Sequence, residues 1–467
     1  MLEARGDENK RTDNAVRADR LDELLEAGRT EEALELLKPL HPTDAADVID
    51  RLPDELRPRA FDLLVECDCD RAADVLLELG EESLRVILAD LEPVEISGLV
   101  RGMDSDDAAD VVAQLHEERR ADIISGLPDE DRNEVAELLK YPESSAGGIM
   151  RLEFVRIPVS DTVAEATDRV RRAAPQDNEP PIVYVVARDG RLAGHLRLRD
   201  LLRHPAGTPV RDIVRPVQEA AHVLDDQEQV AELARKYDYS TVAVLDEAER
   251  LAGIVTSDDI LDVVVEEASE DIAKLGQTAD IEDAFAPVTR SIRGRVPWLF
   301  VSLLGGLLAS AVVLLFRNAI EARVVVAAFM PIVAGMGGAA GNQATNIVVR
   351  ALALGEVTRG DIGRLLWKQV RVGLFAGTAT GLAAGALAAG VAVLVRGNPL
   401  LGGLVMLAMV LNVTVGSTLG AMTPMLLARM GKDPALASSL LLTATTDMVG
   451  LFILLGLAAL ALRFAGF

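Results

Sequence analysis

Five long stretches with almost no charge occupy the C-terminal part of the chain and limit what it can fold into. They cover residues 298–316, 324–349, 372–395, 400–428 and 434–462, and only the last contains a charged side chain, Asp447. Each is close to or beyond the ~20 residues that a helix needs to cross a bilayer. The sequence therefore predicts a membrane domain at residues 297–467 with five transmembrane helices.

The distribution of charge separates this membrane domain from a strongly acidic part upstream. Of 73 acidic and 47 basic residues, 5 and 11 lie from Pro297 onward, so the net charge is −32 upstream and +6 downstream. This acidic excess argues against nucleic acid or an anionic lipid as the partner of the upstream part and favours the attraction of cations. Simple solubility of the upstream part is the alternative.

The basic residues of the loops predict how the chain lies in a cell (inner) membrane. Five spans put the two termini on opposite sides, and the positive-inside rule makes the side richer in Lys and Arg cytoplasmic. The N-terminal domains are therefore expected in the cytoplasm and the C-terminus outside it, and the two cysteines and the charged N-terminus indicate a reducing compartment and no cleavable secretory peptide. The richer side carries Arg290, Arg293, Arg295, Arg350, Arg359, Arg364, Lys368, Arg371, Arg429 and Lys432, and the other side carries Arg317, Arg323, Arg396 and Arg463.

Asp447 is the strongest single indication of function. A carboxylate at bilayer depth usually faces a bundle interior or a water-filled path and marks the passage of ions. A single buried hydrogen bond between helices is the alternative. Asp433, at the start of the last stretch, is expected either to cap a helix or to attract ions at the cytoplasmic mouth.

The second stretch contains a run of small and amide residues, from Gly335 to Gln343, preceded by Pro331. These residues are expected either to break the helix locally and free carbonyl oxygens for a cation, or to pack helices tightly. Gly338 and Asn342 are the candidate pore residues of this run.

The acidic part begins with a helical domain at residues 16–140. A short sequence motif of alanines followed by an aspartate recurs there. Short amphipathic helices separated by recurring turns are typical of a helical solenoid. The copies of the motif are Ala45-Ala46-Asp47-Val48, Ala72-Ala73-Asp74-Val75, Ala108-Ala109-Asp110-Val111 and Ala121-Asp122-Ile123-Ile124.

A second repeat, now rich in β-strands, divides residues 141–208 from residues 209–267. Leu192-Ala193-Gly194 matches Leu251-Ala252-Gly253 at an offset of 59 residues. In the second copy Thr256 and Asp259 have the spacing of a helix capping box. This strand–turn–helix with Thr-x-x-Asp resembles a CBS domain, and a tandem CBS pair often binds an adenine nucleotide such as ATP, whose ribose Thr256 and Asp259 would hold. The first copy has Arg197 at the threonine position, and capping alone is the alternative role.

An acidic helix is predicted to leave the second copy and to connect it, through residues 268–296, to the first span. Asp259, Asp262, Glu266 and Glu270 fall on one face, and Glu267 and Asp271 pair at four residues. Like charges at this spacing repel by ~0.2–0.5 kcal/mol each, so a divalent cation such as Mg²⁺ would stabilise the face. A solvated acidic helix is the alternative.

Taken over nearly its full length, the chain resembles the MgtE family of magnesium transporters. The resemblance rests on Tyr141-Pro142-Glu143, on Ala146 to Met150, on Glu270 to Gly276, and on the order of helical domain, CBS pair, connecting helix and five spans. It implies a homodimeric Mg²⁺-selective channel whose pore lies on the dimer axis, with Asp447 binding the ion. It also implies that cytosolic Mg²⁺ bridges acidic residues and closes the pore. The implied cytosolic positions are Asp106, Asp110, Gly148, Asp226, Glu228, Asp238, Asp259, Asp262, Glu267, Glu270 and Asp271.

Two departures from the family bear on the pore: Ala339 stands where many relatives have Asn, and Ser439-Leu440 replaces a small residue followed by Pro. Other readings are a channel for Co²⁺, Ni²⁺ or Mn²⁺, or a membrane-anchored nucleotide sensor that transports nothing. The spans contain no cluster of His, Cys or Met, which favours hard oxygen ligands. No nucleophile–base arrangement stands out, so an enzyme is not expected.

Overall fold

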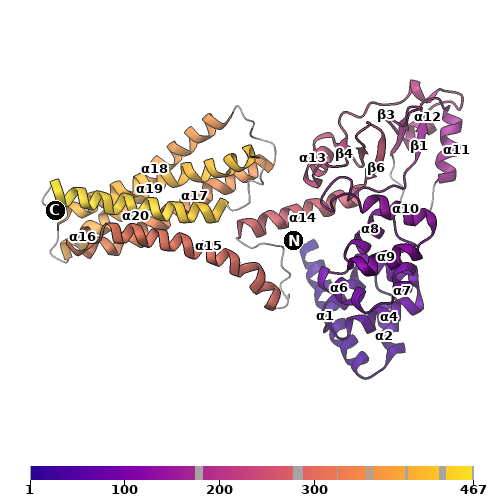
Figure 1. Cartoon of the computed structure of the whole chain (residues 1–467), viewed down its shortest axis with the longest axis horizontal. Helices are drawn as coiled ribbons and strands as arrows, with labels where there is room; N and C mark the ends of the chain where they lie inside the picture. Colours follow the sequence, from indigo (N-terminus) through magenta and orange to yellow (C-terminus); the bar gives the residue numbers. More distant parts are fainter. Residues whose placement is uncertain are drawn as a thin grey trace. The chain divides into compact units, whose positions relative to one another are not determined.

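A computed structural model describes residues 2–173, 182–276, 288–322, 324–353, 357, 361–394, 398–430 and 438–464. The described chain forms two compact units, Met1–Val265 and Glu266–Phe467 (Figure 1).

The first unit begins with ten helices, which form a stack (Figure 1). Most helices pack on the next but one, for example α3 on α5 and α5 on α7, which is the pattern of a solenoid. The alanines and valines of the first three repeated motifs are buried, so the predicted solenoid is confirmed. The helices are α1 (Leu2–Glu26), α2 (Thr30–Leu37), α3 (Pro42–Asp50), α4 (Arg57–Cys67), α5 (Cys69–Leu77), α6 (Glu81–Asp90), α7 (Pro93–Val100), α8 (Ser105–Ala113), α9 (Glu117–Gly126) and α10 (Asp129–Leu138).

Helix ends in this stack are closed by local side chains. Pro42 and Pro93 lie in the first turns of α3 and α7, where the missing N–H has no intrahelical partner in any case. At C-terminal ends arginines donate to free carbonyls: Arg57 Nε lies 3.0 Å from the Leu52 oxygen and Arg132 Nη2 lies 2.8 Å from the Leu127 oxygen. These bonds satisfy carbonyls that a short helix leaves open.

Two three-stranded sheets follow, with strand orders β1-β2-β3 and β4-β5-β6. In each, the first pair is parallel and the second antiparallel. The backbones of Arg191 and Arg250, 59 residues apart, form an antiparallel bridge between the two copies. The repeat predicted from the offset is thus confirmed as a pseudo-twofold pair. The elements are β1 (Arg156–Pro158), α11 (Val163–Ala173), β2 (Ile182–Val186), β3 (Leu192–Arg197), α12 (Leu198–Arg203), η1 (Val210–Asp212), β4 (Ala221–His222), α13 (Gln227–Tyr237), β5 (Val242–Leu245), β6 (Leu251–Val255) and α14 (Ser257–Leu275).

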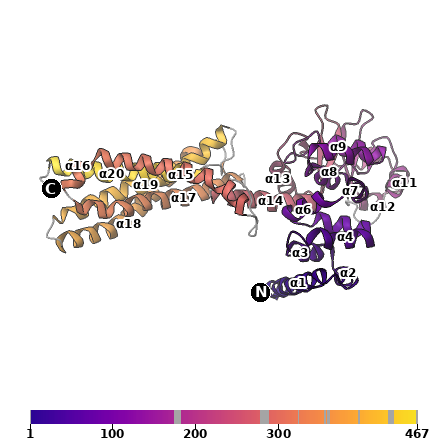
Figure 2. The same ribbon diagram turned by 60° about the horizontal axis from the view of Figure 1, so that its bottom comes forward.

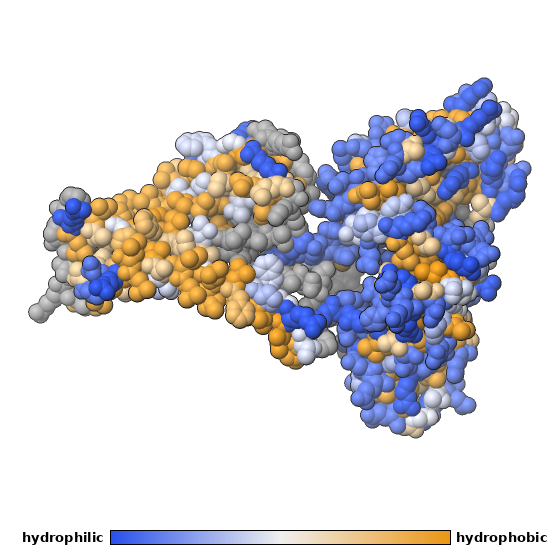
Figure 3. Space-filling model, viewed as in Figure 1, coloured by the Kyte–Doolittle hydropathy of each residue, from blue (hydrophilic) through white to orange (hydrophobic). Residues whose placement is uncertain are grey.

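The second unit contains five helices long and apolar enough to cross a membrane, among the residues described. They run side by side in Figure 2, and the surface of this unit is largely hydrophobic in Figure 3. The elements are α15 (Val288–Leu315), α16 (Arg317–Ala322), η2 (Val324–Phe329), α17 (Met330–Ala353), α18 (Ile362–Leu394), α19 (Leu400–Arg429) and α20 (Ser438–Phe464). Residues 288–296 of the predicted connecting segment form the start of α15.

Glycines allow these helices to approach closely around α19. The buried Gly373, Gly377, Gly381 and Gly385 line the face of α18 that packs on α19, at the four-residue spacing of close helix contacts. On the other side, a Cβ at Gly416 of α19 would lie 2.3 Å from the carbonyl oxygen of Gly337 in α17. Small residues therefore hold α17, α18 and α19 together.

The expectation that α17 breaks within its glycine run is wrong. The α-helix is continuous from Met330 to Ala353, and the irregular geometry is confined to the 3₁₀ segment η2 that ends before Pro331. The glycines serve the other predicted role, since the backbone around Gly337 and Gly341 lies against α19. Close packing keeps the run helical.

Candidate functional site

The N-terminal end of α8 brings a buried acid against the CBS pair. Asp106 is 4% exposed, and neither of its carboxylate oxygens has a hydrogen-bond partner. The nearest cation is Arg151, whose Nε lies 3.6 Å from Asp106 Oδ2 and whose Nη2 lies 2.9 Å from Asp104 Oδ2. One guanidinium therefore faces two carboxylates of the same helix end.

Backbone contacts place this arginine at the boundary between the helical stack and the second CBS repeat. Arg151 and Ile254 of β6 exchange two backbone hydrogen bonds, of 2.7 and 3.0 Å. Ser105 Oγ accepts from the Leu152 N–H at 3.0 Å and donates to Glu153 Oε2 at 2.7 Å. The segment that contains Arg151 is thus tied both to α8 and to the strand that leads into α14.

Electrostatics in this acidic cluster favour protonation of the buried carboxyls. Burial, followed by the charges of Asp259 and neighbouring aspartates, raises the pKa of Asp106 to about 8 against the opposing effect of Arg151. Burial and then the charge of Asp259 raise the pKa of Asp107 to about 7. Carboxylates that are buried close together are unstable in their ionised form, and a bound cation would stabilise that form by offsetting their charge. Sequence reasoning missed Asp107 and Arg151, although both adjoin the quoted motifs.

Thr256 and Asp259 lie at the start of α14, opposite these acids. The Thr256 N–H donates to Asp259 Oδ2 at 3.2 Å, and the Thr256 hydroxyl donates to the carboxylates of Asp258 and Asp259. The carboxylate bond to the Thr256 N–H is one half of the capping box predicted from the sequence. Burial raises the pKa of Asp259 despite the opposing hydrogen bonds from Thr256. In the first repeat Asp200 instead pairs with Arg215 at 3.3 Å.

The other cytosolic candidates fall into separate places. Asp226 caps α13, accepting from the Glu228 N–H at 3.0 Å, and its backbone pairs with Ser145 of the segment that holds Gly148. Gly148 is buried there, where a Cβ would lie 2.3 Å from the Pro142 carbonyl oxygen. Asp238 caps the opposite end of α13 in a left-handed conformation with φ of 53°. The structure thus brings Asp226, Glu228 and Gly148 together and leaves Asp238 apart.

The remaining acids follow one another along α8 and α14. Asp110 is exposed one turn after Asp106. Burial, and then the charges of Asp259, Asp258 and Glu78, raise the pKa of Asp262. In the second unit Glu270 forms an ion pair of 2.5 Å with Lys274, and Glu267 is half-buried. The side chain of Asp271 lies outside the described residues.

In the membrane unit, Asp447 lies half-buried near the middle of α20. The neighbouring Thr446 is fully buried, and its hydroxyl lies 3.6 Å from the position that a Cβ on Gly338 would take. The predicted candidates Gly338 and Asp447 are therefore on adjacent segments of α17 and α20. Asn342, one turn further along α17, has a buried Oδ1 without a hydrogen-bond partner. Asp433 lies outside the described residues.

Sequence reasoning missed a second amide, Asn412 of α19. It is fully buried, and its Nδ2 donates to the Val333 carbonyl oxygen at 2.6 Å while its Oδ1 has no hydrogen-bond partner. Its side chain fills the space beside Gly337 and Gly450, where an added Cβ would lie 2.3 and 2.7 Å from Nδ2. Asn412 thus joins three helices close to Asp447. A lone amide inside an apolar stretch was the signal available in the sequence.

Within the described residues, no three His, Cys, Asp or Glu side chains converge as a ready-made metal site. The acidic cluster nevertheless suits Mg²⁺, which keeps several waters and binds through one or two carboxylates. The buried carboxylate of Asp106, which Arg151 approaches only at 3.6 Å, is the observation that fits a bound cation. Such a site would hold the ion through water and charge.

Three family models match consecutive parts of the chain. One described as "Divalent cation transporter" matches residues 330–457, the MgtE intracellular N domain matches residues 40–144, and the CBS domain matches residues 146–207 and 210–266. Among solved structures, the cytosolic domain of the Mg²⁺ channel MgtE in complex with ATP is 36% identical, covers 53% of this chain and 99% of that chain, and has a TM-score of 0.48.

Curated relatives carry the identification. The magnesium transporter MgtE of Thermus thermophilus is 37% identical over 337 residues, which are 71% of this chain and 73% of that protein. The magnesium transporter MgtE of Bacillus subtilis is 32% identical over 69% of this chain and 70% of that protein. Together with the order of domains in the structure, these similarities place the chain in the MgtE family of magnesium transporters.

Proposed function

We propose that this protein is a channel for Mg²⁺ entry and that Mg²⁺ on its acidic cytosolic domains closes it. The observation that carries the proposal is Asp447, the one acid within the five membrane-spanning segments. A carboxylate at that depth is expensive unless it serves a polar path. No catalytic chemistry is needed for this function.

The proposed pore is formed by α17 and α20 of two protomers. In a homodimer with a twofold axis near Asp447, two carboxylates meet, and a divalent ion offsets their repulsion. Thr446 and Gly338 support this placement because they bring α20 and α17 together one residue before the acid, and Asn342 adds a buried amide oxygen one turn further along α17. Ligation through retained water would favour Mg²⁺, which loses its hydration shell reluctantly. Asp433 belongs to the proposal as an ion-attracting residue at the mouth.

The proposed sensor is the acidic cluster of Asp106, Asp107 and Asp259. Its buried or half-buried and mutually repelling carboxyls favour the packed arrangement only when protons or cations neutralise them. When cytosolic Mg²⁺ falls, repulsion separates the domains and the pore opens. The further candidates at Asp110, Asp226, Glu228, Asp238, Gly148, Asp262, Glu267, Glu270 and Asp271 would bind Mg²⁺ in the same way.

The helical domain (residues 16–140), the two CBS repeats (141–208 and 209–267) and the connecting helix (268–296) then lie in the cytoplasm. Residues 297–467 lie in the cell membrane. The C-terminus is then extracytoplasmic. The excess of Lys and Arg in the loops on one side supports this orientation.

An adenine nucleotide is proposed as a modulator at the second CBS repeat. Thr256 and Asp259 stand at the end of β6, where a ribose would meet a hydroxyl and a carboxylate. Binding there would compete with the hydrogen bonds that now cap α14. Titration of the full-length protein with ATP, compared with Thr256→Ala, tests this part separately.

Flux into proteoliposomes tests the main proposal. Mg²⁺ uptake is measured for the wild type and Asp447→Ala, with Mg²⁺ low or high on the cytoplasmic face, and Glu321→Gln outside the spans serves as the charge-matched control. We expect uptake that high Mg²⁺ suppresses and that Asp447→Ala abolishes. Flux of Co²⁺, Ni²⁺ or Mn²⁺ but not Mg²⁺ would favour another cation, and no flux from folded protein would favour an anchored nucleotide sensor.

A further inference from the structure

The helix α18 is much longer than a bilayer requires. Its 33 residues extend ~50 Å at 1.5 Å per residue, against a hydrocarbon core of ~30 Å. The uncharged part begins only at Val372, so the ten residues Ile362–Arg371 precede the span. If the span begins at Val372, this first part of α18 is expected at the level of the lipid headgroups.

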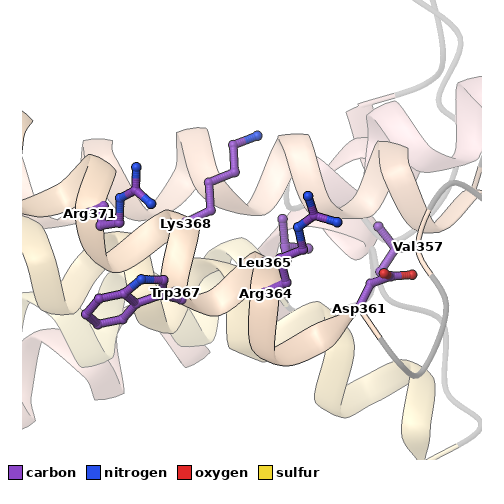
Figure 4. Close-up of a pocket in the computed structure, with 7 residues that line it drawn as sticks. All are labelled: Val357, Asp361, Arg364, Leu365, Trp367, Lys368 and Arg371. Atoms are coloured by element: carbon purple, nitrogen blue, oxygen red, sulfur yellow. The ribbon is translucent and has the colours of Figure 1, made fainter.

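That segment is amphipathic. Ile362, Leu365 and Leu366 pack on a buried cluster of α17 and α19, and Gln369 is 3% exposed. The opposite face is exposed and carries a basic stripe, defined here as Arg364, Lys368 and Arg371, at spacings of four and three residues. Figure 4 shows these three side chains projecting from the same side of the helix.

The basic stripe borders a cavity of about 370 Å³. Trp367, 62% exposed, lines it together with the apolar Val357 and Leu365, and Asp361 lies at its end (Figure 4). Among the described residues no carboxylate forms an ion pair with any member of the basic stripe. Among the described lining residues, three are cations and one is an acid, in a chain whose overall charge is −26.

The face continues along the helix as a hydrocarbon-facing stripe. Phe375 lies four residues after Arg371 and is 75% exposed, and Leu382 follows at the same side and is 56% exposed. A cationic pocket that runs directly into an exposed apolar stripe matches a molecule with a phosphate at one end and an acyl chain at the other. Tryptophan is typical of this boundary.

We propose that this pocket binds an anionic phospholipid. Its phosphate lies among Arg364, Lys368 and Arg371, its glycerol contacts Trp367, and an acyl chain follows Phe375 and Leu382. Soluble phosphate would satisfy only the basic stripe and would leave the apolar continuation unused. The lipid binds independently of the transported ion.

Fluorescence of Trp367 provides the test, because Trp298 is the only other tryptophan. Full-length protein with Trp298→Phe is reconstituted in bilayers that contain phosphatidylglycerol or phosphatidylcholine with brominated acyl chains, and quenching gives the relative binding constant. We expect the wild type to bind phosphatidylglycerol more tightly than phosphatidylcholine. In Arg364→Gln/Lys368→Gln/Arg371→Gln, the ratio of the two binding constants should fall about fivefold for each basic residue replaced.

The matched control replaces three exposed arginines of the same predicted side on other helices, Arg293→Gln/Arg350→Gln/Arg429→Gln. This control variant should still bind phosphatidylglycerol more tightly than phosphatidylcholine. Equal loss in this control would assign the effect to general surface charge and overturn the proposal. So would an unchanged preference in the basic-stripe variant. Inorganic phosphate at equal ionic strength should not relieve the quenching, and if it does, the site belongs to a soluble anion.

Discussion

Replacing Asp106 by asparagine should make the packed arrangement of the helical stack on the CBS pair less dependent on Mg²⁺. The carboxylate is buried, and among the described residues its one ion pair is with Arg151 at 3.6 Å, a guanidinium that it shares with Asp104. A neutral amide of the same shape removes the charge that disfavours packing. The same change removes a candidate Mg²⁺ ligand, so the response to the ion should shrink.

The size of the effect follows from the pKa of Asp106. A carboxyl that titrates at 3.8 when hydrated but at about 8 in the packed state must take up a proton at pH 7, which costs on the order of 4 kcal/mol. The amide avoids this cost, but its own unmet hydrogen bonds cost about 1–3 kcal/mol. The net stabilisation is about 1–3 kcal/mol, or about 5- to 150-fold in the equilibrium between packed and separated domains.

Protease protection and flux measure this equilibrium in the full-length protein. In EDTA at pH 7, Asp106→Asn should be cleaved more slowly than the wild type between the helical stack and the CBS pair, and its Mg²⁺ uptake should be lower at low cytosolic Mg²⁺. Asp74→Asn, an exposed acid at the position of α5 that matches Asp110, is the control for loss of one charge. Faster cleavage of Asp106→Asn than of the wild type without Mg²⁺ would refute the reasoning.

Three further predictions follow from the same structure. The pKa values of Asp106 and Asp107 are raised from 3.8 to about 8 and about 7 in the folded state, so the stability that they contribute at low pH falls as pH rises from about 4 and is lost above about 8. Protease cleavage in EDTA should therefore accelerate from pH 5 to 8 and level off above pH 8, and saturating Mg²⁺ should flatten the curve. Gly416→Ala places a Cβ 2.3 Å from a carbonyl oxygen of α17, so it should lower the free energy of unfolding of the membrane unit by about 1–3 kcal/mol, measured by thermal denaturation. Gly403→Ala, whose Cβ would have no atom within 4 Å, should leave the free energy of unfolding unchanged. Asn412→Ala removes a buried hydrogen bond and should lower Mg²⁺ flux as well as thermal stability, by about 1–3 kcal/mol; unchanged flux with reduced stability would limit it to a packing role.

Features encoded by local pattern were predictable from the sequence. The motif Ala72-Ala73-Asp74-Val75 and its relatives put alanines at the contact face of short helices, and burial of those alanines is what a solenoid requires. The 59-residue offset identified equivalent strands because each copy repeats the same strand–turn–helix. Apolar length alone located the spans.

Features that depend on distant pairing were not predictable. Arg151 joins α8 to β6, which lie about 140 residues apart in the chain, and nothing near it in sequence indicates the carboxylates that it meets. Asn412 has its role only because Gly337 and Gly450 leave room beside it on two other helices. The glycine run of α17 was compatible with a broken helix or with close packing. The glycines of α19 that face this run favour close packing, since the backbones of α17 and α19 are in contact there and α17 is continuous.

The proposed sensor for an abundant ion does not need a complete coordination shell built from protein ligands. A site with complete protein ligation binds a divalent ion tightly and would stay occupied at all physiological levels. Here carboxyls of Asp106, Asp107 and Asp259 face one guanidinium, so the packed arrangement carries surplus negative charge that hydrated cations can neutralise without precise geometry. In the proposed sensor, the affinity for Mg²⁺ would depend on the repulsion between these carboxyls, so modest changes in Mg²⁺ would shift the balance between packed and separated domains.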